Sequence, residues 1–223
     1  MLSLTLTEKD WLLKTFFFKS LPSTQLYLKE LLKKEKPDLP LAIVADNQTA
    51  GVGSRDNSWT SKEGNLFLSF AIELQELPSD LKLESASIYF SYILKETLES
   101  EGSQVFLKWP NDLYIQDKKI AGMITNVVGN ILVCGVGVNL QNVTDEFSAL
   151  DIDINREELL KYYFANIEKK ILWKQVFSKY KLNFQTNQKI FTHIHGKKTD
   201  LSQAVLEEDG SLTINGERIY SLR

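Results

Sequence analysis

The sequence predicts an α+β protein: a mixed, mainly antiparallel sheet with helices packed on one side, followed by a small C-terminal β appendage. Four strand patterns follow one another over residues 104–140, joined by turn residues such as Gly129-Asn130. Helical patterns stand before and after this run. Two turn pairs, Asp209-Gly210 and Asn215-Gly216, punctuate the C-terminal end. Strands in antiparallel succession predict α+β rather than a doubly wound parallel sheet.

Length and composition indicate one main domain with an addition. The chain has 223 residues, of which 43% are hydrophobic and 25% charged, as in an ordinary soluble globular protein. We predict a catalytic domain over residues 1–186 and a small β domain over 187–223. An exposed sheet edge could pair with a second copy, so a homodimer is one expected assembly.

Charge and cysteine usage exclude several classes of function. Twenty-six Lys and Arg against 29 Asp and Glu give a net charge of −3, which lacks the positive field needed for binding to nucleic-acid phosphates. A single cysteine, Cys134, excludes an intramolecular disulfide and a multi-thiolate zinc site, and suits a reducing compartment. The N-terminal residues show neither a signal peptide nor a membrane span. We therefore expect a cytoplasmic protein that binds neither DNA nor membrane.

In the first part of the chain, a helix and two buried strands surround a long connection. Ser23 and Thr24 are capping candidates for a helix over residues 25–34. Residues 41–45 and 66–72 read as buried strands. The connection between these strands is long enough that a functional role is expected.

In the second part, apolar spacing predicts a helix over residues 83–100, and Gly102 follows as a stop. The predicted antiparallel strands then cover residues 104–108, 113–116, 120–127 and 131–138, with turns at Asp117-Lys118 and Gly129-Asn130. Two helices follow over 156–170 and 173–184. Asn155 and Glu158 form a capping-box pattern at the start of the first.

Three motifs could carry chemistry. The loop from Thr49 to Arg55 has two glycines that allow its backbone to approach an anion closely, although two glycines alone fit a flexible turn equally well. In Lys108-Trp109-Pro110-Asn111-Asp112, a lysine precedes stiff backbone, and a fixed ammonium suits a developing phosphate or carboxylate charge. In the segment from Gly135 to Asn139, alternating glycines mark close approach of a ligand or of a crossing helix.

Other kinds of site are weakly supported. His193 and His195 are the two histidines of the chain and stand near the β appendage, which argues against a Ser/His/Asp hydrolase. Cys134 lies in an apolar strand and reads as a buried small side chain rather than a nucleophile.

Taken together and in order, six motifs resemble those of the biotin protein ligases over nearly the whole chain. They are Ser23-Thr24-Gln25; Gln48 to Gly53 with Trp59; Gly64-Asn65-Leu66; Lys108 to Asp112; Lys119 to Gly122; and Gly135 to Asn139. The resemblance implies a class II synthetase-like catalytic domain. It also implies a two-step reaction, in which biotin and ATP with Mg²⁺ give biotinyl-5′-AMP and pyrophosphate, and biotin is then transferred to a lysine of a biotin carboxyl carrier protein of acetyl-CoA carboxylase.

The resemblance also assigns roles to individual residues. Lys108 would be catalytic and neutralise the two reacting anions. The positions matching biotin-binding residues, together with Lys108, are Ser23, Thr24, Gln25, Gln48, Gly51, Val52, Gly53, Ser54 and Gly122. Those matching the ATP or adenylate site are Arg55, Trp59, Asn111, Lys119 and Asn139, with Trp59 stacking on adenine. Asp112 is the candidate Mg²⁺ ligand.

Some positions depart from the family pattern. Arginines usual in the glycine loop are replaced by Val52, Ser54 and Asn57, so we expect Arg55 to take over part of the phosphate contact and the adenylate to be held less tightly. Gln25 stands where asparagine is common, and Asn126 where glutamate is common.

The two ends of the chain also differ from the family pattern. Only 22 residues precede Ser23, too few for the helix-turn-helix domain of ligases that act as repressors. The C-terminal appendage is shorter than the family's usual small barrel.

Two rival functions remain open from the sequence. The first is a lipoate ligase or lipoyl transferase, which also acylates a carrier lysine. The second is a non-catalytic biotin-binding sensor, if the loss of loop arginines has abolished activation.

Overall fold

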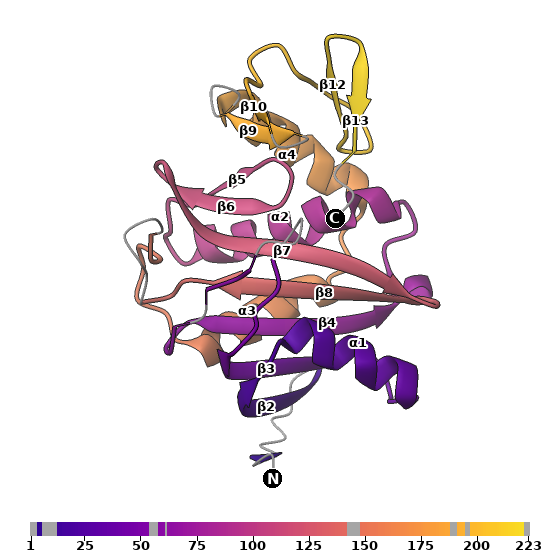
Figure 1. Ribbon diagram of the computed structural model, residues 1–223. Helices are drawn as coiled ribbons and strands as arrows, with labels where there is room; N and C mark the ends of the chain where they lie inside the picture. The colour runs from indigo at the N-terminus through magenta and orange to yellow at the C-terminus, as the bar shows by residue number, and fades with distance from the viewer. Residues whose placement is uncertain are drawn as a thin grey trace.

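A single eight-stranded sheet forms the centre of the computed structural model (Figure 1). The structure describes residues 4–5, 13–53, 58–60, 62–141, 148–187, 191–194 and 197–220. The strand order is β1-β2-β3-β4-β8-β7-β6-β5, and every neighbouring pair is antiparallel except the parallel pair β2–β3. The strands are β1 (Leu4–Thr5), β2 (Lys14–Leu21), β3 (Leu41–Gln48), β4 (Leu66–Glu73), β5 (Phe106–Lys108), β6 (Asp112–Ile115), β7 (Lys118–Val128) and β8 (Ile131–Val138). The predicted mixed, mainly antiparallel sheet is confirmed.

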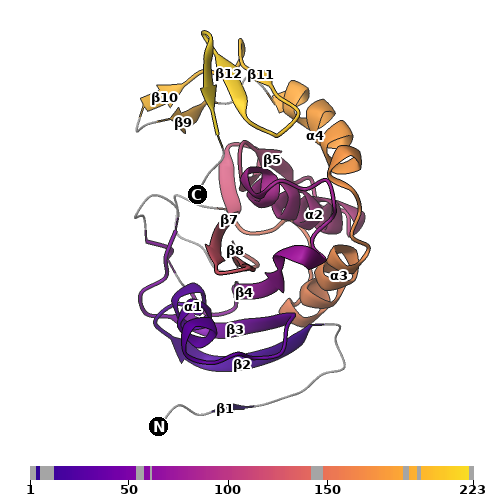
Figure 2. The ribbon, with the colours of Figure 1, turned by 90° about the vertical axis from the view of Figure 1, so that its right-hand side faces the viewer.

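Helices cover both faces of this sheet. They are α1 (Thr24–Lys34), α2 (Ala86–Ser100), α3 (Arg156–Glu168) and α4 (Trp173–Asn187), with short 3₁₀ turns η1 (Leu74–Glu76) and η2 (Leu83–Ser85). Figure 2, which views the sheet from its side, shows α1 on one face and α2 and α3 on the other. The expectation that helices lie on one side is therefore wrong for α1. The reason is the parallel pair β2–β3, whose connection must cross over a face of the sheet, and α1 is that crossover.

Two hydrophobic clusters follow from the alternation of side chains along the central strands. On β3, Leu41 and Ile43 join the cluster under α1, whereas Ala42 and Val44 join the larger cluster under α2 and α3. Phe70 of β4 lies in the larger cluster, where its ring makes edge contacts with rings of α2 and α3. Strands buried on both faces read as continuous apolar runs, as β3 and β4 do.

Local chemistry places several element boundaries as predicted. The Ser23 side chain caps α1 by accepting a bond from the Leu26 N–H, and Asn155 forms the predicted capping box with Glu158 at the start of α3. The helix predicted from residue 83 begins instead at Ala86, because Leu83–Ser85 form the 3₁₀ turn η2.

Turns follow the same local rules. Gly129 joins β7 to β8 with a φ of 61°, in the left-handed region that glycine adopts readily. The turn predicted at Asp117-Lys118 lies one residue earlier, where Gln116 has a φ of 55° and β7 already begins at Lys118.

The C-terminal part contains two small sheets above the main one (Figure 1). Its strands are β9 (Thr192–Ile194), β10 (Lys197–Thr199), β11 (Val205–Leu206), β12 (Leu212–Ile214) and β13 (Glu217–Ile219). The predicted Asn215-Gly216 turn joins β12 to β13. Buried indoles tie this part to the rest of the fold, since Trp109 Nε1, just after β5, donates to Gly210 O at 2.8 Å and Trp173 Nε1, at the start of α4, donates to Glu208 O at 2.8 Å. The division at residue 187 stays a prediction.

Candidate functional site

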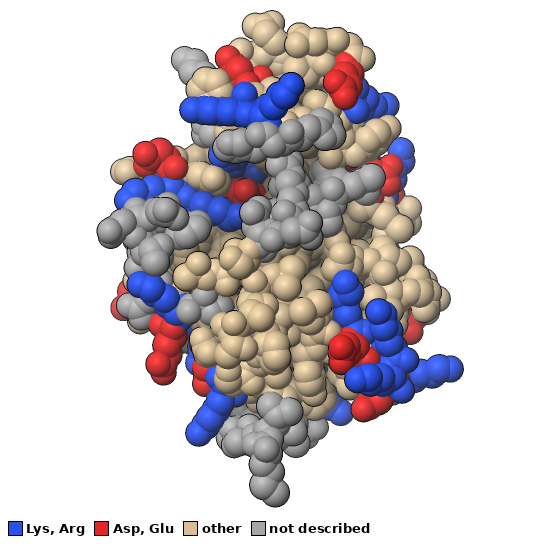
Figure 3. Space-filling view, viewed as in Figure 1, with Lys and Arg blue, Asp and Glu red and all other residues tan. Residues whose placement is uncertain are grey.

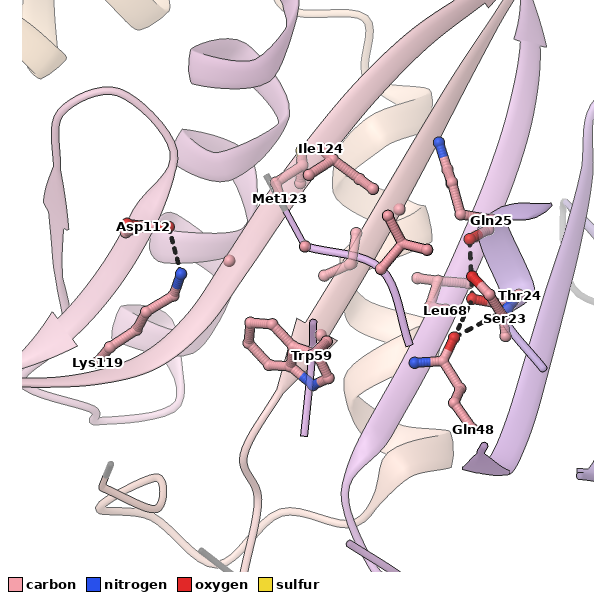
Figure 4. A pocket seen from close by; sticks show the side chains of 17 residues that line it. Ser23, Thr24, Gln25, Gln48, Trp59, Leu68, Asp112, Lys119, Met123 and Ile124 are labelled. Atoms are coloured by element: carbon pink, nitrogen blue, oxygen red, sulfur yellow. Dashed lines mark hydrogen bonds and ion pairs between the residues drawn. The ribbon is translucent and has the colours of Figure 1, made fainter. Parts of the chain in front are cut away.

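One pocket lies on the α1 face of the sheet, where the N-terminus of α1, the end of β3 and strands β4, β7 and β8 meet (Figure 4). It is lined by Ser23, Thr24, Gln25, Gln48, Val52, Gly53, Trp59, Leu68, Ser69, Asp112, Lys119, Gly122, Met123, Ile124, Gly135, Val136 and Gly137. Figure 4 shows Ser23, Thr24, Gln25 and Gln48 at one end, Asp112 and Lys119 at the other, and Trp59 between them. The pocket therefore has a neutral polar end and a charged end.

The neutral end is organised by a chain of hydrogen bonds. Because Ser23 caps α1, the first residues of the helix face the end of β3. Gln48 Oε1 accepts from the Thr24 backbone N–H at 2.8 Å and from Thr24 Oγ1 at 3.2 Å. Ser69 Oγ in turn donates to Thr24 Oγ1 at 2.9 Å. These contacts fix Thr24 and Gln48 in place before a ligand arrives.

Gln25 lies deeper at the same end and is only 3% exposed. Its Nε2 donates to Asn126 Oδ1 at 3.2 Å and to Val133 O at 3.3 Å. Its Oε1 has no protein partner within the described part of the chain. A Cβ at Gly135 would lie 2.6 Å from Gln25 Oε1, so a side chain there would displace the Gln25 amide. The predicted close approach at Gly135 is thus to the crossing helix α1.

The Trp59 indole lies directly on β8 at Gly137. A Cβ at Gly137 would lie 2.4 Å from Trp59 Cε2, so that the missing side chain makes room for the ring. The Trp59 backbone N–H donates to Gly51 O at 2.8 Å, and this bond fixes the base of the glycine loop. Trp59 Nε1 is buried and has no protein partner among the residues described. The ring therefore forms a wall between the two ends of the pocket.

Asp112 and Lys119 form the charged end. Lys119 Nζ lies 2.7 Å from Asp112 Oδ1, and both side chains are 23% exposed. Gly122 leaves room for this pair, since a Cβ there would lie 2.9 Å from Lys119 Nζ. In Figure 3, basic side chains gather over the β6–β7 end of the sheet and over β9 and β10 above it. The charged end therefore has a predominantly basic neighbourhood.

Lys108 lies beside this end, at the last position of β5 and paired in register with Asp112 of β6. Its Nζ is 3.2 Å from the Tyr114 hydroxyl and 4.4 Å from the centroid of that ring. Burial lowers the pKa of Lys108, Asp112 raises it, and the positive charges of Lys119 and Lys198 lower it further. Lys198 belongs to β10, so the C-terminal part contributes charge to this region.

The pocket brings most of the predicted site residues together, and four of those that the structure describes lie outside its lining. Gly51 and Lys108 border it as described. Asn111 is 1% exposed, and its amide Nδ2 donates to Met123 O, so it supports β7 from behind. Asn139 is 5% exposed, and its Nδ2 donates to Ser148 O at 3.4 Å. Ser54 and Arg55 lie outside the described residues.

Sequence reasoning missed Ser69 and the contact between Gln25 and Asn126. Ser69 is a single hydroxyl in an otherwise apolar stretch of β4, a signal that could have been noticed. Nothing local in the sequence indicates that Asn126 meets Gln25, 101 residues away.

The described residues contain no group of three or more His, Cys, Asp and Glu side chains that could hold a metal ion. Asp112 offers a single carboxylate, and its Oδ1 is engaged by Lys119. This suits Mg²⁺ that is bound mainly by substrate phosphates and one carboxylate, and does not suit an ion held by protein ligands alone.

Residues 17–141 match the biotin/lipoate A/B protein ligase family. The chain belongs to this family. The matched segment contains every residue that lines the pocket, from Ser23 to Gly137.

Solved structures of the ligase family resemble the chain over most of its length. The biotin acetyl coenzyme A carboxylase synthetase from Helicobacter pylori, with bound biotinylated ATP, is 39% identical with a TM-score of 0.88, covering 92% of this chain and 98% of that one. The biotin protein ligase from Aquifex aeolicus, in complex with biotin and ATP, is 25% identical with a TM-score of 0.73, covering 89% and 90%.

Among curated ligases, the bifunctional ligase/repressor BirA of Bacillus subtilis is 33% identical over 137 residues, which are 57% of this chain and 40% of that protein. BirA of Escherichia coli is 36% identical over 106 residues, 44% of this chain and 32% of that protein. The matched segments thus span less than half of these longer relatives. No helix among the described residues is both long and apolar enough to cross a membrane.

Proposed function

We propose that this chain is a biotin protein ligase, which activates biotin with ATP and transfers it to a lysine of a biotin carboxyl carrier protein. The observation that carries the proposal is the two-ended pocket, with a buried hydrogen-bonding end at α1 and a charged end formed by Asp112 and Lys119, with Lys108 beside it. The likeness to a synthetase with bound biotinylated ATP, which covers 98% of that chain, supports it.

Each end suits one part of the adduct. Thr24, Gln25 and Gln48 offer fixed donors and acceptors to the biotin ring, with Ser23 beside them and Met123 and Ile124 as apolar walls. Gly51, Val52 and Gly53 would lie beside the biotin tail, and Ser54 and Arg55 remain candidates for contacts with biotin and with the phosphate, respectively. Trp59 would stack on adenine, a contact worth about 1–3 kcal/mol.

The first step joins two anions. A biotin carboxylate oxygen bonds to the α-phosphorus of ATP, the bond from that phosphorus to the bridging oxygen breaks, and pyrophosphate leaves. Two unit negative charges about 4 Å apart repel by about 4 kcal/mol at an effective dielectric constant of about 20. Lys108, whose ammonium is held at Tyr114, offsets this repulsion, and losing such a preorganised donor costs roughly 3–4 kcal/mol, or about 10²–10³ in rate.

Other charged groups would act around this step. Lys119 would bind phosphate oxygens once ATP competes with Asp112 for its ammonium. Asp112 would then offer an oxygen to the Mg²⁺ that accompanies ATP, and this ion supplies charge neutralisation when bound. Asn111 and Asn139 do not line the pocket, so they would support the nucleotide site through the backbone that they bond. Asn111 does so by donating to Met123 O of β7, and Asn139 by donating to Ser148 O.

In the second step, the neutral amine of the carrier lysine attacks the biotinyl carbonyl carbon and AMP leaves. The acceptor would be the biotin carboxyl carrier subunit of acetyl-CoA carboxylase, in keeping with the name of the Helicobacter pylori synthetase. A cytoplasmic location and a homodimer paired through a sheet edge remain predictions, as does the absence of DNA binding.

A transfer assay tests the proposal. The full chain would be mixed with ATP, Mg²⁺, a purified carrier domain and either biotin or lipoate, and the carrier's mass would be measured. A carrier whose acceptor lysine is replaced by arginine is the control. We expect a biotin adduct on the intact carrier alone. A lipoate adduct formed equally well would favour the rival lipoate ligase, and biotin binding without pyrophosphate release would favour a non-catalytic sensor.

A further inference from the structure

Lys108 stands on a strand that the sheet supports on one side only. It is the last residue of β5, which is three residues long, lies at the end of the strand order and pairs with β6. A short edge strand leaves the backbone groups of its outer side without a ladder partner, so its position depends on what the flanking residues contact. The residue that follows Lys108 is Trp109, which is only 2% exposed.

Trp109 is bonded to the C-terminal part of the chain at two points. Its indole Nε1 donates to Gly210 O at 2.8 Å, a normal distance for an N–H···O bond. Its carbonyl oxygen accepts a longer bond, of 3.4 Å, from Thr192 Oγ1 of β9, and Thr192 is itself buried. The end of β5 therefore takes support from the C-terminal part in addition to its pairing with β6.

Gly210 belongs to a turn, residues 207–211, that joins β11 to β12 and is docked as a whole on the main fold. In Figure 2, β11 and β12 lie above β5 and beside α4. Three consecutive carbonyl oxygens of the turn each accept from a side chain of a different segment: Glu208 O from Trp173 Nε1 of α4 at 2.8 Å, Asp209 O from Ser85 Oγ of η2 at 2.7 Å, and Gly210 O from Trp109. The turn is thus fastened to three segments at once.

Bonds within the turn make it a rigid acceptor. The Glu207 N–H donates to Ser211 O at 2.9 Å, and the Gly210 N–H donates to Glu207 O at 2.8 Å. The Asp209 carboxylate accepts from Ser211 Oγ at 2.6 Å and from the Arg218 guanidinium at 2.8 Å. Because these bonds hold the Gly210 carbonyl in one direction, that carbonyl fixes the direction of the indole that donates to it.

We propose that the turn of residues 207–211 is a positioning element for biotin activation, which fixes the Trp109 indole and thereby keeps the Lys108 ammonium where the biotin carboxylate meets the α-phosphate. Trp109 does not line the pocket, so it acts through Lys108 and is a positioning residue. The inference rests on the proposed function. It adds a role for residues that lie outside the segment matched by the family, which ends at residue 141.

The two buried tryptophans provide a matched pair of variants. Trp109→Phe and Trp173→Phe each remove an indole N–H that donates at 2.8 Å to a carbonyl of the same turn, and each keeps an aromatic ring in place. Of the two tryptophans, Trp109 adjoins Lys108 in the chain and Trp173 lies on α4. Biotin-dependent ATP–pyrophosphate exchange by the full chain gives kcat and the KM for each substrate, and thermal melting gives the stability.

We expect Trp109→Phe to lower kcat about tenfold while both KM values stay within about twofold of the wild type, because a small displacement of the ammonium acts on the transition state rather than on substrate binding. Trp173→Phe should lower Tm to a similar extent but keep kcat within about twofold, since Ser85 and Trp109 still hold the turn. Equal losses of kcat in the two variants, or an unchanged kcat in Trp109→Phe, would overturn the inference.

Thr192 gives a second test, which also decides the matter if Trp109→Phe does not fold. Thr192→Val removes the hydroxyl that donates to Trp109 O and nearly keeps the shape of the side chain, whereas Thr192→Ser keeps the hydroxyl. We expect kcat to fall about two- to fivefold in Thr192→Val, because the bond is longer than that of the indole, and to recover in Thr192→Ser. Equal kcat in Thr192→Val and the wild type would overturn the inference.

The activity of the wild type separates this inference from the proposed function. A wild type that catalyses no biotin-dependent exchange would contradict the ligase activity and, with it, the role of the turn. An active wild type whose two tryptophan variants lose kcat equally would contradict the role of the turn alone.

Discussion

Substitution of each of two glycines on β8 should weaken the binding of a different substrate. Gly135 and Gly137 point to the same face of the sheet two residues apart, and a side chain at each would meet a different pocket residue. A Cβ at Gly137 would lie 2.4 Å from Trp59 Cε2, and a Cβ at Gly135 would lie 2.6 Å from Gln25 Oε1. We predict that Gly137→Ala weakens ATP binding and that Gly135→Ala weakens biotin binding.

The distances set the expected magnitude. Ordinary contact begins at 3.4 Å, so the Trp59 ring must retreat from 2.4 Å by about 1 Å to accommodate the methyl group that Gly137→Ala introduces. The strand cannot yield instead, because Gly137 pairs with Phe67 on one side and Gly122 on the other. Overpacking of this kind costs about 1–3 kcal/mol, which corresponds to a roughly 5- to 150-fold rise in KM for ATP.

Each variant is the control for the other. Biotin-dependent ATP–pyrophosphate exchange would be measured with ATP varied at saturating biotin and then with biotin varied at saturating ATP. Thermal melting would show whether either variant loses its fold. Equal rises in both KM values for both variants, or a Gly137→Ala protein that loses biotin affinity alone, would refute the assignment of the two ends.

Three further predictions concern charge and packing. Because burial lowers the pKa of Lys108, the alkaline fall of kcat/KM for exchange should occur at a pH below 10.5, the ordinary pKa of lysine. Since the charge of Lys198 lowers this pKa further, Lys198→Ala should move the alkaline fall to higher pH. An alkaline fall at the same pH in both proteins would contradict the contribution of Lys198. Burial raises the pKa of Asp209, but hydrogen bonds from Ser211 and Arg218 outweigh this effect and hold the pKa below its usual 3.8. The ionised carboxylate therefore contributes its full stabilisation of the fold above about pH 4, and this contribution is lost as the pH falls through the lowered pKa. Asp209→Asn should therefore lower Tm at pH 7 and match the wild type at strongly acidic pH, and a constant difference in Tm would argue against this linkage. Trp109→Phe leaves the buried Gly210 carbonyl without its donor and should cost about 1–3 kcal/mol in urea unfolding, whereas an unchanged midpoint would show that the bond contributes nothing.

Element boundaries were predictable where chemistry near in sequence decides them. The Ser23 cap, the Asn155 capping box and the Gly129 turn each depend on residues within a few positions. The position of α1 on the opposite face depends instead on β2 pairing in parallel with β3. No short window of sequence contains that pairing.

The candidate site was predictable to the extent that its residues stand in recognisable motifs. Lys119, Gly122 and Trp59 meet in the pocket as the ordered motifs suggest. The contacts of Gln25 with Asn126 and of Thr24 with Ser69 join residues 101 and 45 positions apart, and they arise from strand register. Sequence patterns at single positions do not determine such register.

The most direct test of the role of Lys108 is the rate of biotin-dependent ATP–pyrophosphate exchange in Lys108→Ala, with both substrates saturating and biotin affinity measured in parallel. We expect kcat to fall by about 10²–10³ while biotin still binds, because the ammonium acts on the charge that develops between carboxylate and α-phosphate. Undiminished exchange in this variant would contradict that role.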